Sequence, residues 1–441
     1  MGKQLTSVGI DVGTTSTQLI VSELTVANRA SGFSVPELAI TDRRIRYQSP
    51  IYFTPLLRDT LVDGEKLREI IVNEYWAAGL AREHVDTGAI LVTGETSRKE
   101  NARAVSEALS DLAGDFVVAT AGPDLESALA AKGSGAVAYS AETGKPVLHM
   151  DIGGGTSNLA LIRGGILEKT GCLNVGGRLV KLDETGTVSY VSPVLSGLTD
   201  LRVGDQPGRA RLRTLADTLV QALEMAAGVR EEGPLLTRLS TEEAGAVFRT
   251  QEPVTLSFSG GVAACIREEH PMLEFGDMGP VLGQAIAESR LCRGEYRLGR
   301  EPIRATVIGA GCHSAQLSGS TVFYQNIPFP LKNLPVVCPG ETPPEEHHVL
   351  ALPGPSGGYA ALAALSEEVP EQDMILVCLE TDAAKALGQK LALRFGTQKP
   401  ILCLDGIRLP PGSYLDVGEP LGPALPVVVK TLIWKEGTSH E

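Results

Sequence analysis

A glycine-rich turn that begins with an aspartate occurs twice in this chain, and no other feature limits the fold as strongly. The first copy reads DVGTTST over residues 11–17, and the second reads DIGGGTS over residues 151–157. Strand-like apolar segments flank both copies, so each predicts a β-hairpin with a polar tip. A shift of 140 residues aligns Asp11 with Asp151, Gly13 with Gly153 and Leu19 with Leu159. Such a match indicates an internal duplication.

Helical and strand-like patterns alternate after each hairpin. Apolar residues at helical spacing predict an amphipathic helix over residues 65–81. The next segments read as strand, helix, strand and helix over residues 89–94, 98–112, 115–122 and 124–133. The second copy is followed by a polar, irregular stretch over 183–210, by helices over 211–228 and 240–249, and by the third glycine turn, FSGGV, at 258–262. Alternation of this kind is typical of an α/β fold.

Three domains follow from these patterns. We expect a first half over residues 1–140, a second half over residues 146–291 and an added C-terminal domain over residues 300–441. In the C-terminal domain, the sequence predicts strands over ATVIGAG (305–311) and STVFYQ (320–325). A strand–helix stretch over 347–369 and a β-rich tail complete it.

Charge and composition exclude several classes of protein. The net charge of −14 opposes binding to nucleic acid or to an anionic membrane surface. The seven cysteines form no CxxC pair and no zinc-binding spacing, and there is no uninterrupted apolar run of 18 residues. We therefore expect a soluble cytoplasmic protein. Such an acidic chain can bind a polyphosphate only where backbone N–H groups and a metal ion offset its charge.

The two turns supply what a nucleoside triphosphate needs. Glycines and small hydroxyl residues let several backbone N–H groups approach phosphate oxygens, and carboxylates are ligands that Mg²⁺ prefers. We expect the hairpins to face each other across the β- and γ-phosphates, with Asp11 and Asp151 directed at the metal. The third turn suits a flat base or a ribose. The candidate nucleotide-binding residues are Gly13, Thr14, Thr15, Thr17, Gly153, Gly154, Gly155, Thr156, Ser157, Ser259, Gly260 and Gly261.

In this order, the three turns resemble the phosphate-1, phosphate-2 and adenosine motifs of the actin, Hsp70 and sugar-kinase superfamily of ATPases. Residues 121–136 and 275–286 resemble the two connecting helices of that superfamily. The resemblance implies duplicated actin-like, ribonuclease H-like ATPase domains with a nucleotide cleft between them, followed by a C-terminal α/β addition. It also implies ATP and Mg²⁺ as ligands.

Within the superfamily, the chain most closely resembles the ethanolamine ammonia-lyase reactivating factors. Segments that carry this likeness include SVGIDVGTTSTQLIVSEL, DTGAILVTGETSRKENAR, CLNVGGRLV and RATVIGAGCHSAQLSGSTV. The family implies ATP-dependent release of damaged cobalamin from ethanolamine ammonia-lyase, so that intact adenosylcobalamin can bind. The lyase is then the partner, and association with an ethanolamine-utilization microcompartment is one option for location. The oligomeric state stays open, with a homodimer as one alternative.

Hydrolysis also needs a residue that orients the attacking water. The candidates are Glu126 first, then Asp124, then Glu95. The Hsp70 pattern has Glu-Pro at the point where this chain has Pro123-Asp124, so the resemblance does not settle which carboxylate acts.

Two other functions are compatible with the same fold. A small-molecule kinase of the same fold would need a dedicated base for a substrate hydroxyl, and the sequence offers no clear one. A non-catalytic nucleotide-binding scaffold is the other alternative, but the hydroxyl residues in both turns argue against it.

The run Gly309–Gly311 follows a predicted strand as in a dinucleotide-binding motif, but Ser314 occupies the third glycine position. We instead assign these glycines to the wall of the nucleotide cleft.

Overall fold

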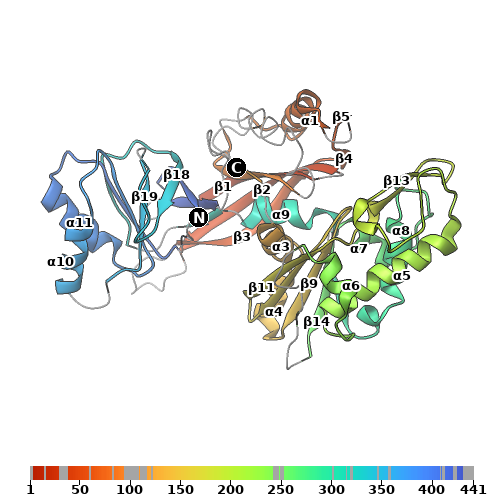
Figure 1. The fold of residues 1–441 in the computed structure, drawn as a ribbon. Coiled ribbons are helices and arrows are strands. Elements are labelled where there is room, and N and C mark those ends of the chain that lie inside the picture. The colour runs from red at the N-terminus through yellow and green to blue at the C-terminus, as the bar shows by residue number, and fades with distance from the viewer. Residues whose placement is uncertain are drawn as a thin grey trace.

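The structure is a computed structural model in which three groups of strands and helices follow one another along the chain (Figure 1). It describes residues 3–13, 16–28, 38–58, 61–81, 84–93, 117–120, 123–241, 253–299, 302–313, 315–317, 321–344, 347–355, 359–407, 413–420 and 425–430, together with residues 109, 248 and 409. Most of the predicted helix over 98–112, and residues 242–247 and 249 of the one over 240–249, lie outside these ranges.

The first sheet is built on the N-terminal hairpin. Its strand order is β3 (Leu38–Gln48), β2 (Ser16–Asn28), β1 (Lys3–Val12), β7 (Thr87–Val92) and β8 (Val117–Thr120). The first three strands pair antiparallel, and β7 and β8 continue the sheet in parallel from β1. The short β4 (Tyr52–Phe53) pairs with β2, and β5 (Leu56–Arg58) pairs with β6 (Leu61–Val62). Helix α1 (Gly64–Ala77), close to its predicted range, buries Leu67 and Ile71 against this sheet.

The second sheet repeats this topology strand for strand. Its order is β11 (Ile166–Leu173), β10 (Ser157–Arg163), β9 (Val147–Ile152), β14 (Thr255–Ser259) and β15 (Tyr296–Leu298). The first three strands again pair antiparallel, and β14 and β15 again follow in parallel. The duplication is therefore present in three dimensions, and both halves have the ribonuclease H-like arrangement of actin-like proteins.

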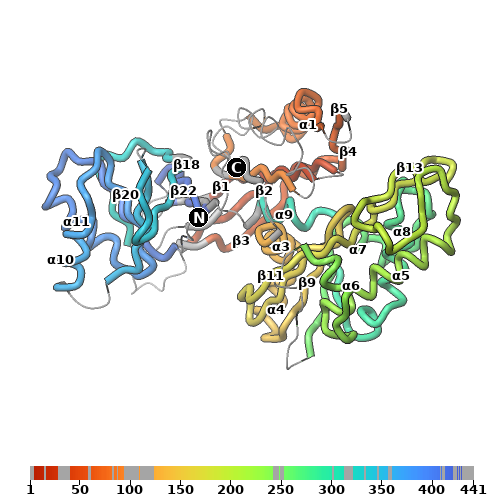
Figure 2. Tube along the Cα trace, viewed as in Figure 1, coloured from red at the N-terminus to blue at the C-terminus, as the bar shows by residue number. Residues whose placement is uncertain are grey.

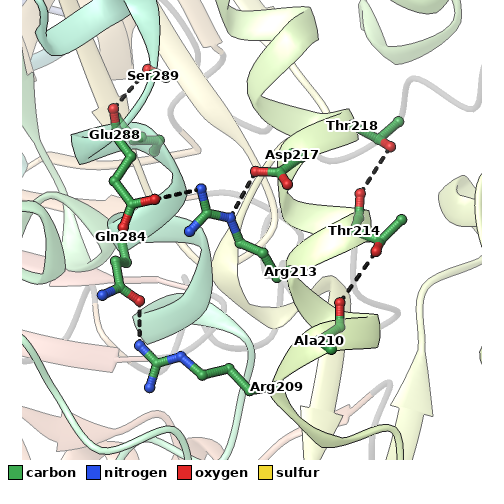
Figure 3. Close-up of polar contacts among 10 residues, drawn as sticks. Arg209, Ala210, Arg213, Thr214, Asp217, Thr218, Gln284, Glu288 and Ser289 are labelled. Atoms are coloured by element: carbon green, nitrogen blue, oxygen red, sulfur yellow. Dashed lines mark hydrogen bonds and ion pairs between the residues drawn. The ribbon is translucent and has the colours of Figure 1, made fainter.

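Within the described ranges, the second half also contains four α-helices and a small hairpin. They are α5 (Gly208–Ala226), α6 (Pro234–Leu239), α7 (Gly261–Arg267) and α8 (Gly279–Ala287), with β12 (Val180–Leu182) paired to β13 (Val188–Val191). Strand β13 lies inside the stretch over 183–210 that the sequence predicts to be irregular, so that prediction is wrong at this strand. Figure 3 shows how α5 is fixed to α8 at the surface. Arg213 donates to Asp217 at 2.7 Å and contacts Glu288 at 2.9 Å, while Arg209 donates to Gln284.

Two helices lie where the halves meet. Helix α3 (Pro123–Gly133) leads, with α4 (Ala136–Thr143), from the first sheet to the second, and α9 (Ala305–His313) brings the chain back to the first sheet (Figure 1). The prediction of a strand over 305–311 is wrong. Val307 packs against Ile20 of β2, and Ala310 packs toward α3 and β7, so the segment is apolar on several sides. A short helix buried in this way has no polar face to reveal its period.

Glycines allow α3, α9 and β1 to approach closely. A Cβ on Gly133 would lie 1.9 Å from the carbonyl oxygen of Ala305, and one on Gly309 would lie 2.2 Å from that of Leu129. On the other side of α9, a Cβ on Gly9 would lie 2.6 Å from the backbone nitrogen of Gly311. Gly309 and Gly311 therefore serve helix packing, and the assignment of these two glycines to the cleft wall is wrong.

The C-terminal part forms a mixed sheet of its own. Its order is β16 (Ala315–Leu317), β23 (Pro426–Lys430), β22 (Tyr414–Val417), β18 (Leu331–Val337), β19 (Val349–Leu352), β20 (Ile375–Leu379), β21 (Ile401–Asp405) and β17 (Phe323–Gln325). Strands β18 to β21 are parallel neighbours, with helices α10 (Tyr359–Glu368) and α11 (Ala384–Phe395) between them in the chain. The C-terminal α/β addition is thus confirmed, and Figure 2 shows its trace apart from the second half.

The domain boundaries at 140, 146, 291 and 300 stay predictions. Among the described residues, no helix is both long enough and apolar enough to cross a membrane.

Candidate functional site

A cavity of about 360 Å³ lies between the two halves. Both duplicated turns and the third glycine turn line it, as do residues from α3 and from the segment before α9. Its volume falls within the range of small-molecule sites. Among the lining residues are Asp11, Gly13, Ser16, Gln18, Phe53, Thr93, Glu126, Asp151, Gly153, Gly154, Gly155, Thr156, Asn158, Arg178, Gly260, Gly261, Asp277, Ile303 and Thr306.

The two predicted metal-binding aspartates lie in this cavity, and their pKa values are raised. Burial raises the pKa of Asp11 from its ordinary value of 3.8 to about 7; the hydrogen bond from Thr93 opposes the rise, and the charge of Asp151 adds to it. Burial also raises the pKa of Asp151 to about 6, against hydrogen bonds from Ser259 and Thr306. The Thr93 hydroxyl donates to Asp11 at 2.8 Å. Two buried carboxylates that repel each other form a site that a cation would stabilise.

A buried hydrogen-bonded chain supports Asp151 from behind. The hydroxyl of Ser259 donates to Asp151, so its oxygen must accept from Nε2 of His149, 2.9 Å away. The other ring nitrogen of His149 then accepts from Ser257 at 3.1 Å and faces Ser134 at 3.4 Å. Burial lowers the pKa of His149 to about 3, so the ring is neutral. The chain fixes both the tautomer of His149 and the orientation of Ser259.

Backbone forms much of the cavity wall. Gly153, Gly154 and Gly155 line it, and Gly176 packs so closely behind them that a Cβ there would lie 2.3 Å from the carbonyl oxygen of Gly154. Gly260 has a φ of +91°, and a Cβ there would lie 2.3 Å from the carbonyl oxygen of Ile152. Positions 176 and 260 therefore require glycine. A wall of this kind offers N–H groups to phosphate oxygens without side chains in the way.

The hydroxyl residues of the turns divide into two groups. Thr156 lines the cavity. Thr17 and Ser157 instead face the protein interior, where Thr17 shares a hydrogen bond with Thr54 at 3.1 Å and Ser157 donates to the carbonyl of Val175 at 2.7 Å. Their side chains brace the hairpins. Thr14 and Thr15 lie outside the described residues.

The three candidate water-orienting carboxylates have different positions. Glu126 is 8% exposed, lines the cavity and accepts a hydrogen bond of 2.8 Å from Nδ2 of Asn158. Asp124 is exposed and accepts from Thr170 of β11, away from the lining residues. Glu95 lies outside the described residues. The geometry therefore favours Glu126 over Asp124.

Sequence reasoning missed several lining residues. Gln18 and Asn158 stand directly across from Asp11 and Asp151 in the two hairpins, a register that the duplication alone could have pointed to. Two further lining residues form an ion pair, in which Nε of Arg178 donates to Asp277 at 3.3 Å. The guanidinium of Arg178 also lies 5.4 Å from the ring centre of Phe53, which comes from the first half. Nothing in the sequence links these last three residues.

The comparisons with known proteins point to one family. The family described as "Ethanolamine utilisation protein EutA" matches residues 3–352 and 358–435. The ethanolamine ammonia-lyase reactivase EutA of Salmonella typhimurium is 39% identical, with 98% of each chain covered. The Escherichia coli protein of the same name is 38% identical over the same shares. A solved structure of a Ppx/GppA family member from Aquifex aeolicus covers 60% of this chain and 69% of its own, with 16% identity and a TM-score of 0.36. From the family match and the two full-length relatives, we conclude that the chain belongs to the EutA family of ethanolamine utilisation proteins.

Proposed function

We propose that this protein reactivates ethanolamine ammonia-lyase at the expense of ATP, releasing damaged cobalamin so that intact adenosylcobalamin can bind. The observation that carries the proposal is the cavity between two duplicated hairpins, each of which contributes a buried aspartate. Full-length identity of 39% to a relative named as a reactivase of that lyase supports the partner. On this proposal the protein acts in the cytoplasm, in association with an ethanolamine-utilization microcompartment.

The residues present fit a magnesium nucleotide. Asp11 and Asp151 would hold the ion, because hard carboxylate oxygens suit Mg²⁺ and because both groups are destabilised as anions without a nearby cation. When bound, Mg²⁺ would screen the charge of the phosphates. The backbone of residues 153–155 would donate to phosphate oxygens, and Gly260 and Gly261 would allow the base or ribose to approach the backbone.

In the same arrangement, the bound nucleotide can determine how the two halves are positioned relative to each other. The cavity draws its lining from both halves, so a ligand that contacts both favours one relative position of the halves over others. Glu126 would accept the proton of the attacking water. Hydrolysis would remove the contacts to the γ-phosphate and release that position. A lyase-binding surface whose affinity differs between the two positions would then bind and release the lyase in each cycle.

Calorimetry with a non-hydrolysable ATP analogue and Mg²⁺ tests the nucleotide site. We expect binding by the wild type and a loss of about 100-fold or more in Asp11→Asn and Asp151→Asn, because each removes a charged ligand. Asp217→Asn, an exposed aspartate on α5, is the matched control and should bind as the wild type does. Equal affinity in all four proteins would reject the site.

Labelled ATP separates this function from that of a kinase. With γ-labelled ATP, a reactivase should release the label as inorganic phosphate, at a rate that rises when inactivated lyase is added. Transfer of the label to a small metabolite, with no effect on the lyase, would establish the kinase instead.

A further inference from the structure

Gln18 carries an unexplained polar atom at the wall of the cavity. The side chain is 3% exposed and lines the cavity, yet its Oε1 has no hydrogen-bond partner within the part of the chain that the structure describes. Its Nε2 donates to the carbonyl oxygen of Ile303 at 3.2 Å. A buried carbonyl oxygen without a donor costs roughly 1–3 kcal/mol, so a ligand or a water that donates to it is expected.

The amide orientation is fixed by its neighbour. If the amide were rotated by half a turn, Oε1 would face the carbonyl of Ile303 and two oxygens would repel each other. The nitrogen must therefore face Ile303. The amide nitrogen is held by the segment that leads into α9, and no described residue donates to the amide oxygen.

The position of Gln18 places it beside the reacting groups. It is the cross-strand partner of Asp11 in the β1–β2 hairpin, so the two side chains project from the same face of the sheet. In the second hairpin, Asn158 holds the corresponding place across from Asp151, and its amide nitrogen is bonded to Glu126. The duplicated amides therefore differ: Asn158 fixes the carboxylate of Glu126, while Gln18 offers an acceptor.

We propose that Gln18 orients the water that attacks ATP, with Oε1 accepting one of its hydrogens. This inference rests on the proposed function. A carboxamide can aim a water molecule but cannot take its proton, so Glu126 accepts that proton. As the water oxygen bonds to the γ-phosphorus, the bond from that phosphorus to the β,γ-bridging oxygen breaks and ADP leaves with the electron pair. Glu126 then returns the proton to solvent.

Because the side chain of Gln18 is neutral, we expect its loss to change the affinity for ATP very little. Gln18 brings no positive charge to the phosphates, so it should contribute little to ground-state binding of ATP and mainly to the rate of the chemical step. A loss in rate without a loss in ATP affinity therefore distinguishes a residue that orients the water from one that binds phosphate or only supports the fold.

Two variants of the full-length protein test the proposal. Gln18→Met removes the donor and the acceptor in a side chain of similar length. Gln18→Lys removes the acceptor but can still donate to Ile303 and adds a positive charge near the phosphates. We expect kcat for ATP hydrolysis to fall by about 10- to 100-fold in both, with KM for ATP in Gln18→Met within about twofold of the wild type.

Analogue affinities give a readout apart from turnover. Magnesium ADP with beryllium fluoride mimics bound ATP, and magnesium ADP with aluminium fluoride mimics the transition state with its in-line water. By calorimetry, Gln18→Met should bind the first as the wild type does and the second more weakly, by about the same factor as the loss in kcat. Unchanged kcat in Gln18→Met would overturn the proposal and leave Oε1 to a structural water. Wild-type activity in Gln18→Lys would show that the bond to Ile303 is what matters.

Failure of this inference is distinguishable from failure of the proposed function. If the wild type neither binds nor hydrolyses magnesium ATP, the proposed function falls. If the wild type does both and the Gln18 variants match it, only the role of Gln18 falls.

Discussion

On the proposed function the chemistry depends on Asp11 and Asp151, and burial makes both costly to keep as anions. They lie buried in one cavity, and the charge of Asp151 raises the pKa of Asp11. A folded protein usually retains such groups for binding or catalysis. Their cost should be visible in the stability of the protein without ligand.

Asp11→Asn should change how stability depends on pH. A carboxyl group whose pKa is raised from 3.8 to about 7 stabilises the fold while it is protonated, and that contribution is lost as the pH rises from about 4 through about 7. Without Mg²⁺ or nucleotide, the stability of the variant relative to the wild type should therefore rise between pH 4 and pH 8 by up to about 4 kcal/mol, since the pKa is raised by about three units and one unit corresponds to about 1.4 kcal/mol. Urea denaturation at both values measures this. A difference between the two proteins that does not vary with pH would contradict it.

His149 should act in the opposite direction at acid pH. Its pKa is lowered from 6.5 to about 3 by burial, so the stability that depends on its neutral form is present above pH 6.5 and is lost as the pH falls toward 3. His149→Gln cannot be protonated and should lose less stability than the wild type between pH 6.5 and pH 4. Thermal denaturation across that interval checks it, and parallel losses in both proteins would refute the assignment.

Helices α3 and α9 connect the halves, and their close approach depends on glycine. Gly133→Ala should destabilise the protein by roughly 1–3 kcal/mol, because the added Cβ would lie 1.9 Å from the carbonyl oxygen of Ala305. Gly294→Ala is the matched control, since a Cβ there meets nothing within 4 Å. Urea midpoints should separate the two variants; equal midpoints would mean that the helices can move apart freely.

The hairpins were predictable from sequence, and α9 was not. The turns at 11–17 and 151–157 repeat both polar tips and flanking apolar strands, so local pattern and duplication agree. Residues 305–311 contain only small and β-branched residues, apolar throughout apart from Thr306, which fits a buried strand as well as a buried helix. The contacts to α3 and β1 decide between them, and those contacts are long-range.

The site was predictable only where chemistry is local to a turn. The aspartates and glycines of the turns lie in the cavity as expected. Thr17 and Ser157 turn inward because alternation along a strand sends neighbouring side chains to opposite faces. Arg178 and Asp277 pair across 99 residues of the second half, and Phe53 reaches Arg178 from the first half, so no local spacing in the sequence indicates these contacts.

The whole molecule places a cavity between two copies of one domain, with a separate α/β unit after them (Figures 1 and 2). The halves are joined through α3 and α9, while the wall residues come from both sides. This arrangement lets a small ligand influence large parts of the chain, because it contacts both halves at once.

Nucleotide should therefore stabilise the protein as a whole. At a concentration of Mg²⁺ and non-hydrolysable ATP analogue near 100 times Kd, the free energy of unfolding should rise by about 2.7 kcal/mol. A shift in Tm that grows with analogue concentration in the wild type and is absent in Asp151→Asn would bear this out. An equal shift in both proteins would place the nucleotide elsewhere.

Reactivation itself is tested by measuring the deamination that ethanolamine ammonia-lyase regains. The lyase is first blocked with cyanocobalamin and then incubated with this protein, adenosylcobalamin, Mg²⁺ and ATP. We predict recovery of activity with the wild type, and none with Asp11→Ala, with Asp151→Ala or when ATP is omitted. Recovery without ATP, or full recovery with both variants, would contradict the claim that the cavity between the two halves drives reactivation.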